Sequence, residues 1–217
     1  MGEKMIKSCP LCFGQDISKI HEGEGRHYLQ CGACQLVFVP KEFHLTQEAE
    51  KTHYDSHENN PNDLGYRTFL SKIFIPLNEL LKEKSSGLDF GSGPGPTLSI
   101  MFEEKGHTMV IYDKYYSPDN SVLDKSYDFI TLTEVIEHLT TPARDLDLLW
   151  GLVKPNGYLG IMTQLNEETI SFKDWYYRLD PTHICFFGPK TFVEVAKKWG
   201  AKMTIFHPNA IIFQKLL

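Results

Sequence analysis

The sequence predicts an α/β protein, in which a mostly parallel sheet is flanked by helices and a small metal-binding module lies toward the N-terminal end. Three observations support this prediction. From residue 61 onward, short apolar runs alternate with segments of helical periodicity. A glycine-rich turn follows the first of these apolar runs. Four of the five cysteines lie within the first 34 residues, as two closely spaced pairs.

The composition suits one α/β domain of ordinary size with a small appendage. The chain has 217 residues, of which 41% are hydrophobic and 23% charged, so we expect a soluble globular protein. No apolar run approaches the roughly 20 residues that a membrane span needs. The first eight residues are polar and charged, without the apolar centre of a signal peptide. A cytoplasmic location is therefore expected.

The cysteines follow the pattern Cys9-x-x-Cys12 and Cys31-x-x-Cys34, with eighteen residues between the two pairs. Each pair can bring two thiolates to one ion, and four thiolates fill the tetrahedral coordination of zinc. In a cytosolic chain, paired cysteines indicate metal ligands before disulfides. We therefore predict a structural zinc ribbon over residues 1–40, with short extended runs at 27–30 and 36–39.

A larger domain, residues 62–217, follows a polar segment over residues 41–61 that is typical of a linker or a lid. Helical and extended patterns alternate along the larger domain, which indicates a sheet whose ligands bind beyond the carboxyl ends of the strands. The predicted helices span 62–84, 96–105, 142–153 and 189–199, and the predicted strands span 87–90, 108–112, 127–133, 158–164, 203–206 and 211–214.

The turn after the first strand carries Gly91, Gly93 and Gly95 at alternate positions, and Asp89 stands two residues before the first glycine. Glycines allow the backbone to approach a ligand closely. The dinucleotide-binding fingerprint has its third glycine one residue later, so this turn is a variant of that pattern. Asp113 ends the second strand, 22 residues after Gly91, where an acidic residue accepts hydrogen bonds from ribose hydroxyls.

Together with the strand that begins at Tyr127 and the turn from Lys154 to Gly157, these motifs resemble class I methyltransferases that use S-adenosylmethionine (SAM). The resemblance covers residues 61–217 and implies a Rossmann-like sheet with SAM as cofactor. Only thirteen residues separate Asp113 from Tyr127, so a shortened third-strand region is expected. The resemblance implies cofactor contacts at Asp89, Gly91, Gly93, Gly95, Asp113, Asp128, Tyr66 and Arg67, where ordinary helix surface is the alternative for the last two.

The segment after the fourth strand carries Glu134, Glu137 and His138, and His183 follows later in the chain. This order resembles two groups of O-methyltransferases, those of the ubiquinone pathway and those that methylate the 2′-hydroxyl of small RNAs. In the second group two Glu and two His bind a divalent ion, which implies a magnesium site at these four residues. Without a metal, His138 or His183 is the candidate base and Glu134 a further catalytic candidate, because imidazole titrates near neutral pH. A structural role for both histidines is the alternative.

We therefore expect an enzyme that transfers a methyl group from SAM to a small-molecule acceptor, at oxygen. One alternative is an RNA methyltransferase that contacts RNA through the zinc ribbon. Another is a SAM-binding protein without catalysis, whose ribbon docks a protein. The formal net charge of −6 argues against a nucleic-acid partner, because dedicated binders carry basic patches. The sequence leaves the acceptor and the oligomeric state open.

Overall fold

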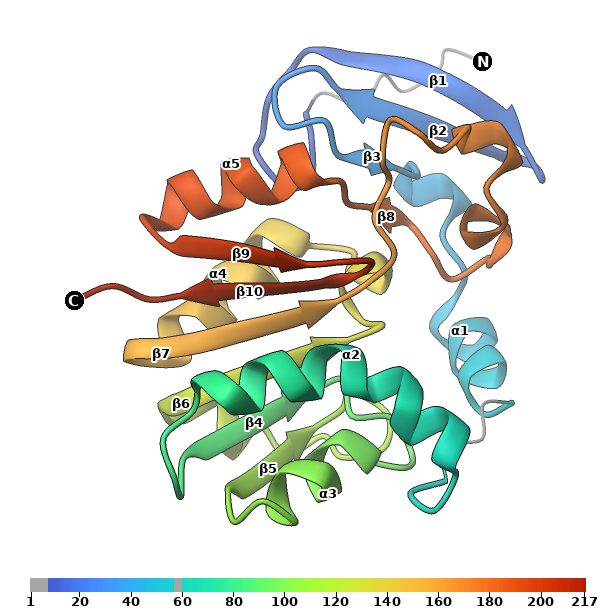
Figure 1. Ribbon diagram of the computed structural model, residues 1–217. Helices are drawn as coiled ribbons and strands as arrows, with labels where there is room; N and C mark the ends of the chain where they lie inside the picture. The colour runs from blue at the N-terminus through green and yellow to red at the C-terminus, as the bar shows by residue number, and fades with distance from the viewer. Residues whose placement is uncertain (1–7, 57–59) are drawn as a thin grey trace.

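The computed structural model, which describes residues 8–56 and 60–217, contains a six-stranded and a four-stranded sheet (Figure 1). The six-stranded sheet has the order β5-β4-β6-β7-β10-β9. Its first four strands pair in parallel, and the hairpin of β9 and β10 adds to β7 in antiparallel fashion. The predicted α/β class is confirmed. The strands are β4 (Ser86–Phe90), β5 (Thr108–Tyr112), β6 (Tyr127–Thr133), β7 (Val153–Met162), β9 (Lys202–Phe206) and β10 (Ala210–Gln214).

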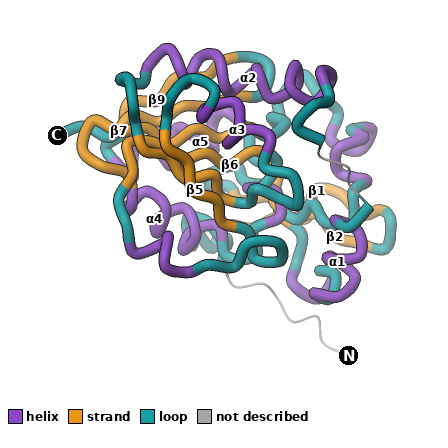
Figure 2. Tube along the Cα trace, turned by 90° about the horizontal axis from the view of Figure 1, so that it is seen from below, coloured by secondary structure: helices purple, strands orange, loops and turns teal. Residues whose placement is uncertain are grey.

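Helices cover both faces of this sheet. Figure 2 shows α2 (Leu64–Leu80) and α3 (Thr97–Glu103) on one side of the strands and α4 (Pro142–Leu152) on the other. The helix α5 (Pro189–Trp199) contributes side chains to the same core cluster as α4. Successive side chains of a strand point to opposite faces, so the apolar residues of β10 enter both cores in alternation.

The region that normally supplies a third strand is short, as the sequence predicts. β5 lies at the edge of the sheet, and the chain returns to β6 through a single 3-10 turn, Asn120–Asp124. The helix predicted over 62–84 was placed too long, because α2 ends at Leu80. Gly87, the first residue of the predicted strand 87–90, lies inside β4, where it is buried against its neighbours.

The N-terminal sheet has the order β1-β2-β3-β8, with β1 (Ile17–Gly23), β2 (Arg26–Cys31), β3 (Val37–Phe38) and β8 (Cys185–Phe186). A two-residue turn joins β1 to β2, and both of its residues, Glu24 and Gly25, have positive φ values of 51° and 70°. Such a turn matches the right-handed twist of a hairpin. The fourth strand comes from the larger domain, so the ribbon is completed by a segment far along the chain.

Residues 41–61 run from the ribbon to the larger domain and contain a short 3-10 turn, Lys41–Phe43, and the helix α1 (Gln47–Tyr54). The predicted division at residues 40 and 61 stays a prediction, and residues 1–7 and 57–59 lie outside the described part. Within the described residues, no helix is both long enough and apolar enough to cross a membrane. The remaining 3-10 turns are Ile136–His138, Phe172–Asp174 and Tyr176–Leu179.

Replacing Gly87 with alanine should destabilise the fold. An added Cβ would overlap the ring of Phe129 and lie 2.6 Å from Met109 Sδ, inside a close-packed core. Overpacking of this kind costs about 1–3 kcal/mol. The matched control is Gly151→Ala in α4, where nothing lies within 4 Å of the added atom and alanine favours the helix. Urea unfolding should show Gly87→Ala less stable and Gly151→Ala unchanged or more stable, and equal stability of both variants would contradict this packing argument.

Candidate active site

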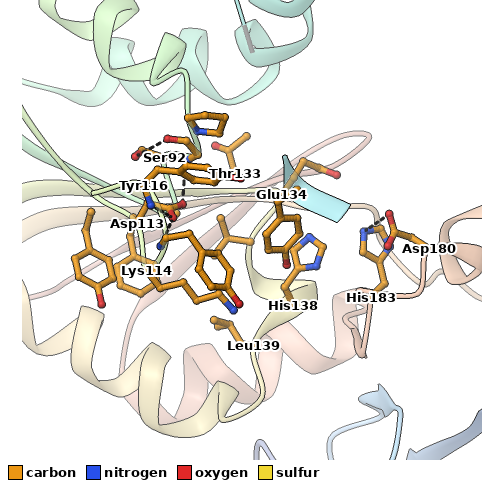
Figure 3. A pocket seen from close by; sticks show the side chains of 18 of the residues that line it. Ser92, Asp113, Lys114, Tyr116, Thr133, Glu134, His138, Leu139, Asp180 and His183 are labelled. Atoms are coloured by element: carbon orange, nitrogen blue, oxygen red, sulfur yellow. Dashed lines mark hydrogen bonds and ion pairs between the residues drawn. The ribbon is translucent and has the colours of Figure 1, made fainter. Parts of the chain in front are cut away.

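A cavity of about 650 Å³ opens at the carboxyl ends of β4, β5, β6 and β7. This volume lies within the range of about 300–1,000 Å³ that is typical of small-molecule sites. Residues that directly follow β4, β5 and β6 line it, as does Gln164 just beyond β7, which is expected for a parallel sheet. In Figure 3, Ser92 and Asp113 lie at one end of the cavity, and His138, His183 and Asp180 lie at the other.

The glycine turn forms one wall of the cavity. Gly91 has a φ of +77° and Gly93 a φ of +64°, values that glycine adopts without strain. A Cβ on Gly91 would overlap the side chain of Val135, so this position requires the smallest residue for its close packing as well. Backbone N–H groups of Gly91 and Ser92 donate to the carbonyl of Tyr112, which fixes the turn against the end of β5.

Asp113 organises the turn from the neighbouring strand. Its Oδ2 accepts from the backbone N–H of Gly93 at 3.0 Å, and its Oδ1 accepts from those of Tyr115 at 2.8 Å and Tyr116 at 3.1 Å. A carboxylate can accept about four hydrogen bonds. Three are used here, so Oδ2 keeps the capacity to accept one more from a bound molecule. Asp113 lines the cavity, as the ribose-binding prediction requires.

Two buried polar atoms at the end of β6 have no hydrogen-bond partner among the described residues: Thr133 Oγ1 and Glu134 Oε1. Both residues line the cavity, and Glu134 has a positive φ of 52°. Burial, reinforced by the charge of Glu137, raises the pKa of Glu134 well above its ordinary range. An unpaired buried polar group costs free energy, so these atoms are suited to bind polar groups of a ligand.

Two of the predicted cofactor contacts lie outside the cavity lining because their side chains join strands to each other. Asp89 is buried and accepts from Thr131 Oγ1 at 2.8 Å and Ser99 Oγ at 3.2 Å, and burial raises its pKa to about 6. Asp128 stands near the amino end of β6, opposite to the cavity. There it accepts from the backbone N–H of Ser86 at 2.8 Å and from Lys154 Nζ at 3.0 Å.

Of the other predicted cofactor contacts, Tyr66 lines the cavity, whereas Arg67 and Gly95 do not. Tyr66 lines the cavity, and burial raises its pKa to about 12. Arg67, one residue later on α2, donates to the carbonyl of Pro61 at 3.3 Å and forms an ion pair with Glu104, outside the cavity. Gly95 also lies outside the lining, although its neighbour Pro94 belongs to it. A one-residue step along a helix turns a side chain by about 100°, which separates Tyr66 from Arg67.

The two histidines lie side by side at the far end of the cavity, with their ring centroids 4.8 Å apart. His138 Nδ1 donates to the carbonyl of Thr182 at 3.1 Å, and His183 Nδ1 donates to the carbonyl of Tyr177 at 2.7 Å. Because a carbonyl only accepts, each neutral ring carries its proton on Nδ1 and leaves a lone pair on Nε2. Burial lowers the pKa of His138, so this ring is held mainly in the neutral form.

A carboxylate stands near each free imidazole nitrogen. Glu137 Oε1 lies 3.9 Å from His138 Nε2, and Asp180 Oδ2 lies 3.8 Å from His183 Nε2. Burial alone would raise the pKa of Asp180, but the hydrogen bonds from Thr182 and the electrostatic interaction with His183 lower it to about 2. Asp180 also contacts His53 Nε2 at 3.2 Å.

The predicted four-residue metal site is assembled only in part. Glu137, His138 and His183 have ligand atoms within 4.8 Å of one another, whereas Glu134 is outside this group. The hydroxyl of Tyr177 contacts both carboxyl groups, that of Glu134 at 3.2 Å and that of Glu137 at a shorter distance, so Glu134 lies beside the group without belonging to it.

The polar segment 41–61 covers the cavity through α1. Tyr54 lines the cavity, and its ring meets that of His138 edge to face at a centroid distance of 5.3 Å. Glu50 accepts from Lys114 Nζ at 2.7 Å and from the hydroxyl of Tyr115 at 2.6 Å. α1 has no fully buried residue, and it is held in place by these polar contacts together with the ring contact of Tyr54.

Sequence reasoning assigned no role to several residues that line the cavity. Lys114 directly follows Asp113, and Asp180 lies three residues before His183, so their positions beside predicted residues were a usable signal. By contrast, the aromatic run 172–177 is a candidate wall of an acceptor pocket or the core of a lid on the sequence alone, and Tyr176 and Tyr177 line the cavity while Trp175 is buried. No local pattern distinguished Tyr54, because its contact with His138 depends on the path of residues 41–61.

The four cysteines of the ribbon meet at one point. Cys9 Sγ lies 3.6 Å from Cys34 Sγ, Cys12 Sγ lies 3.5 Å from Cys31 Sγ, and all four sulfurs lie within 4.8 Å of one another. Sulfurs that bind one tetrahedral zinc ion at about 2.3 Å are separated by about 3.8 Å. The spacing therefore suits a four-thiolate zinc site, with no coordination position left for a substrate.

Comparisons with known proteins agree with this architecture. The model of a methyltransferase-domain family matches residues 64–204. A search of curated proteins finds no match. The structure of CalO1, a methyltransferase of calicheamicin biosynthesis in its SAH-bound form, aligns with a TM-score of 0.53 at 12% identity, over 78% of this chain and 58% of that chain.

Two structures from Burkholderia thailandensis are also similar. An O-methyltransferase family protein aligns with a TM-score of 0.50 at 14% identity, over 77% of this chain and 63% of that chain. The 1,6-didemethyltoxoflavin-N1-methyltransferase, with bound 1,6-didemethyltoxoflavin and S-adenosylhomocysteine, aligns with a TM-score of 0.56 at 13% identity, over 92% of this chain and 100% of that chain. The chain thus spans less than two thirds of CalO1 and of the O-methyltransferase, and at these identities the likeness concerns the fold.

The cysteine cluster should bind one zinc ion per chain, and Cys34→Ser should lose most of it. Structural zinc contributes folding free energy, so the variant should also unfold at a lower temperature. The control is Cys185→Ser, which replaces a buried thiol that lies outside the cluster. Elemental analysis of purified protein measures the zinc content. An absence of zinc from the unmodified chain, or an equal loss in both variants, would refute a four-cysteine site.

Proposed function

The chain belongs to the methyltransferase-domain family, and on this premise we propose that it transfers a methyl group from SAM to an oxygen atom of a small-molecule acceptor. One observation carries the proposal: a single cavity joins the glycine turn and Asp113 to the pair His138 and His183. The similar toxoflavin methyltransferase, with S-adenosylhomocysteine and a small acceptor bound together, supports the use of one cavity for both molecules.

The end of the cavity at β4 and β5 suits the nucleoside of SAM, and the end of β6 suits its methionine portion. When bound, SAM supplies a methyl group that its sulfonium sulfur has already activated. The glycine turn would let the ligand approach the backbone closely, and Asp113 Oδ2 would accept a hydrogen bond from a ribose hydroxyl. Thr133 Oγ1 and Glu134 Oε1 are unpartnered in the described residues and would bind the polar groups of the methionine portion.

His138 would act as the general base. A hydroxyl must lose its proton as its oxygen attacks the methyl group, and a base within hydrogen-bond distance promotes that transfer. The Nδ1–H bond to Thr182 holds the ring in the tautomer that leaves the Nε2 lone pair toward the cavity. Glu137, at 3.9 Å from Nε2, would stabilise the positive charge that the ring gains.

The charges around the cavity favour an uncharged or cationic small molecule. Among the described residues that line it, Lys114 is the one permanent cation, and Glu50 pairs with it. The carboxylates of Asp113, Asp145 and Asp180 also belong to the lining. A phosphate or carboxylate group on the acceptor would meet repulsion there. The same charges disfavour the RNA alternative, and membership of a methyltransferase family disfavours a role in binding alone.

A divalent ion at Glu137, His138 and His183 is the second candidate for activation of the acceptor. The ligand atoms within 4.8 Å support it, as do the carbonyl partners on both Nδ1 atoms, because metal-binding histidines usually have such partners. Two imidazoles and one carboxylate suit zinc, iron or manganese better than magnesium, which prefers oxygen ligands.

Asp113→Ala should weaken the binding of SAM and of S-adenosylhomocysteine by about 10-fold to 100-fold, because hydrogen bonds to a charged group are lost. Isothermal titration calorimetry measures both affinities. The control is Asp124→Ala, which removes an exposed carboxylate from the 3-10 turn after β5 without touching the cavity lining. Unchanged affinity in Asp113→Ala would refute its role, and failure of the unmodified chain to bind either ligand would refute the proposed cofactor.

His138→Asn should lower kcat/KM for the acceptor by about 10²-fold to 10⁴-fold while the affinity for S-adenosylhomocysteine stays within about twofold. The base form is the active one, and burial lowers the pKa of His138 below its ordinary 6.5. The activity of the unmodified enzyme should therefore fall only as the pH drops below about 6.5, and it should be flat above that value.

The measurement is initial-rate kinetics between about pH 5 and 8 with an acceptor found by screening hydroxylated aromatic compounds. The control is His207→Asn, which changes an exposed imidazole. A variant at position 138 that keeps both the native rate and the acid limb of the pH profile would exclude His138 as the base.

A further inference from the structure

Arg26, the first residue of β2 in the ribbon, is buried at 6% exposure and reaches into the larger domain. Its Nη1 donates to the carbonyls of Pro181 at 3.2 Å and His183 at 3.1 Å. Its Nη2 donates to the carbonyls of Arg178 at 2.5 Å and Asp180 at 3.1 Å. One guanidinium thus binds four carbonyls of a single six-residue segment.

This segment, residues 178–183, carries two residues of the acceptor end of the cavity, Asp180 and His183. Its first two residues end the 3-10 turn Tyr176–Leu179, and the segment has no strand partner before β8. The carbonyl of Asp180 also accepts from the backbone N–H of His183 at 3.2 Å, and the charge-assisted bonds from the rigid guanidinium fork add to this local support. Among the described residues, no carboxylate forms an ion pair with Arg26, so the carbonyls are its principal polar partners.

The ribbon contacts the same region at further points, among them an ion pair between Glu24 and Arg178. The hydroxyl of Tyr28, on the strand that carries Arg26, donates to the carbonyl of Arg178 at 3.2 Å. Beyond His183, the backbone N–H of Val39 donates to the carbonyl of Ile184 at 2.9 Å, and β3 then pairs with β8. No comparable set of bonds links the ribbon to the glycine turn or Asp113 among the described residues.

We propose that Arg26 is a positioning residue for the acceptor end of the cavity, through which the zinc ribbon fixes Asp180 and His183. The ribbon is then a structural part of the active site and not a separate docking module. The proposal rests on the proposed function only for its expected effect on methyl transfer. It requires that loss of the guanidinium fork alter residues 178–186 and leave the cofactor end unchanged.

The test compares Arg26→Lys with the unmodified chain and with Arg144→Lys, which makes the same change at an exposed position on α4. Lysine keeps the charge but cannot bind four carbonyls in one plane. Hydrogen exchange of the backbone amides in 178–186 should become about 10-fold to 100-fold faster in Arg26→Lys alone. Calorimetry with S-adenosylhomocysteine should give an affinity within about twofold of the native value.

Nitrogen NMR of ¹⁵N-labelled histidine supplies a readout that a general loss of stability would not produce. In the unmodified chain, His183 should show the single tautomer that the Nδ1 bond to Tyr177 imposes. In Arg26→Lys, His183 should show a mixture of tautomers, and the exposed His207 should be unchanged. Tyr28→Phe removes one of the hydrogen bonds to the carbonyl of Arg178. It should change the exchange rates of 178–186 and the His183 signal in the same direction by a smaller amount. This variant replaces Arg26→Lys in the test if Arg26→Lys does not fold.

Unchanged exchange in 178–186 and an unchanged His183 signal, in a folded variant, would overturn the proposal. So would a loss of S-adenosylhomocysteine affinity that parallels the exchange, because the effect would then be global. If the unmodified chain binds no S-adenosylhomocysteine, the proposed function fails, but hydrogen exchange and the histidine signal still decide the role of Arg26.

Discussion

The buried carboxylate of Glu137 is the interaction on which the arrangement of the cavity depends. It is fully buried and accepts hydrogen bonds from Thr163 Oγ1 at 3.1 Å and from the hydroxyl of Tyr177. The carbonyl of the same residue accepts from the backbone N–H of Ile184 at 2.9 Å. Glu137 therefore joins the loop after β6, the end of β7 and the segment that leads into β8. Burial of a charge is tolerated only when donors surround it, so these segments are ordered together.

The cavity is built by two different means. At the cofactor end, the strand ends and the glycine turn that follows β4 form the wall of the cavity. These residues are close in sequence and belong to, or directly follow, regular strands. At the acceptor end, irregular segments meet, and side chains replace the missing backbone partners. Tyr177, Glu137 and Arg26 all serve this purpose from different parts of the chain. This difference explains why local sequence patterns locate the first end more readily than the second.

The same difference sets how far the sequence predicts the structure. The strands of the six-stranded sheet, the helices α3 to α5 and the glycine turn have local periodicity or punctuation, so their positions were predicted to within a few residues. Two predictions were wrong: the helix before β4 was too long, and β7 begins at Val153, so that the predicted turn from Lys154 to Gly157 lies inside the strand. The position of Asp113 at the ligand-binding edge of the sheet could be predicted because this residue directly follows a strand, and its side chain lines the cavity. Asp128 lies on a predicted strand too, but near its amino end, and the sequence pattern alone did not indicate which end faces the cavity.

Residues whose roles depend on distant partners could not be predicted in this way. Arg26 is a lone arginine in a short strand, and nothing near it in sequence indicates the carbonyls that it binds. β1 and β8 were missed for a related reason, since polar residues dominate the first and the second has only two residues. The position of Tyr54 over His138 likewise follows from the path of the whole 41–61 segment.

The pairing of β3 with β8 also constrains the order in which parts of the protein can fold during synthesis. Val37 pairs with Phe186, so the ribbon sheet cannot be completed until most of the chain has left the ribosome. The four cysteines emerge early and can meet at once, but the apolar residues beside them belong to a core cluster that includes α4 and α5. A nascent ribbon must therefore keep part of its apolar surface exposed until β8 and α5 have been synthesised.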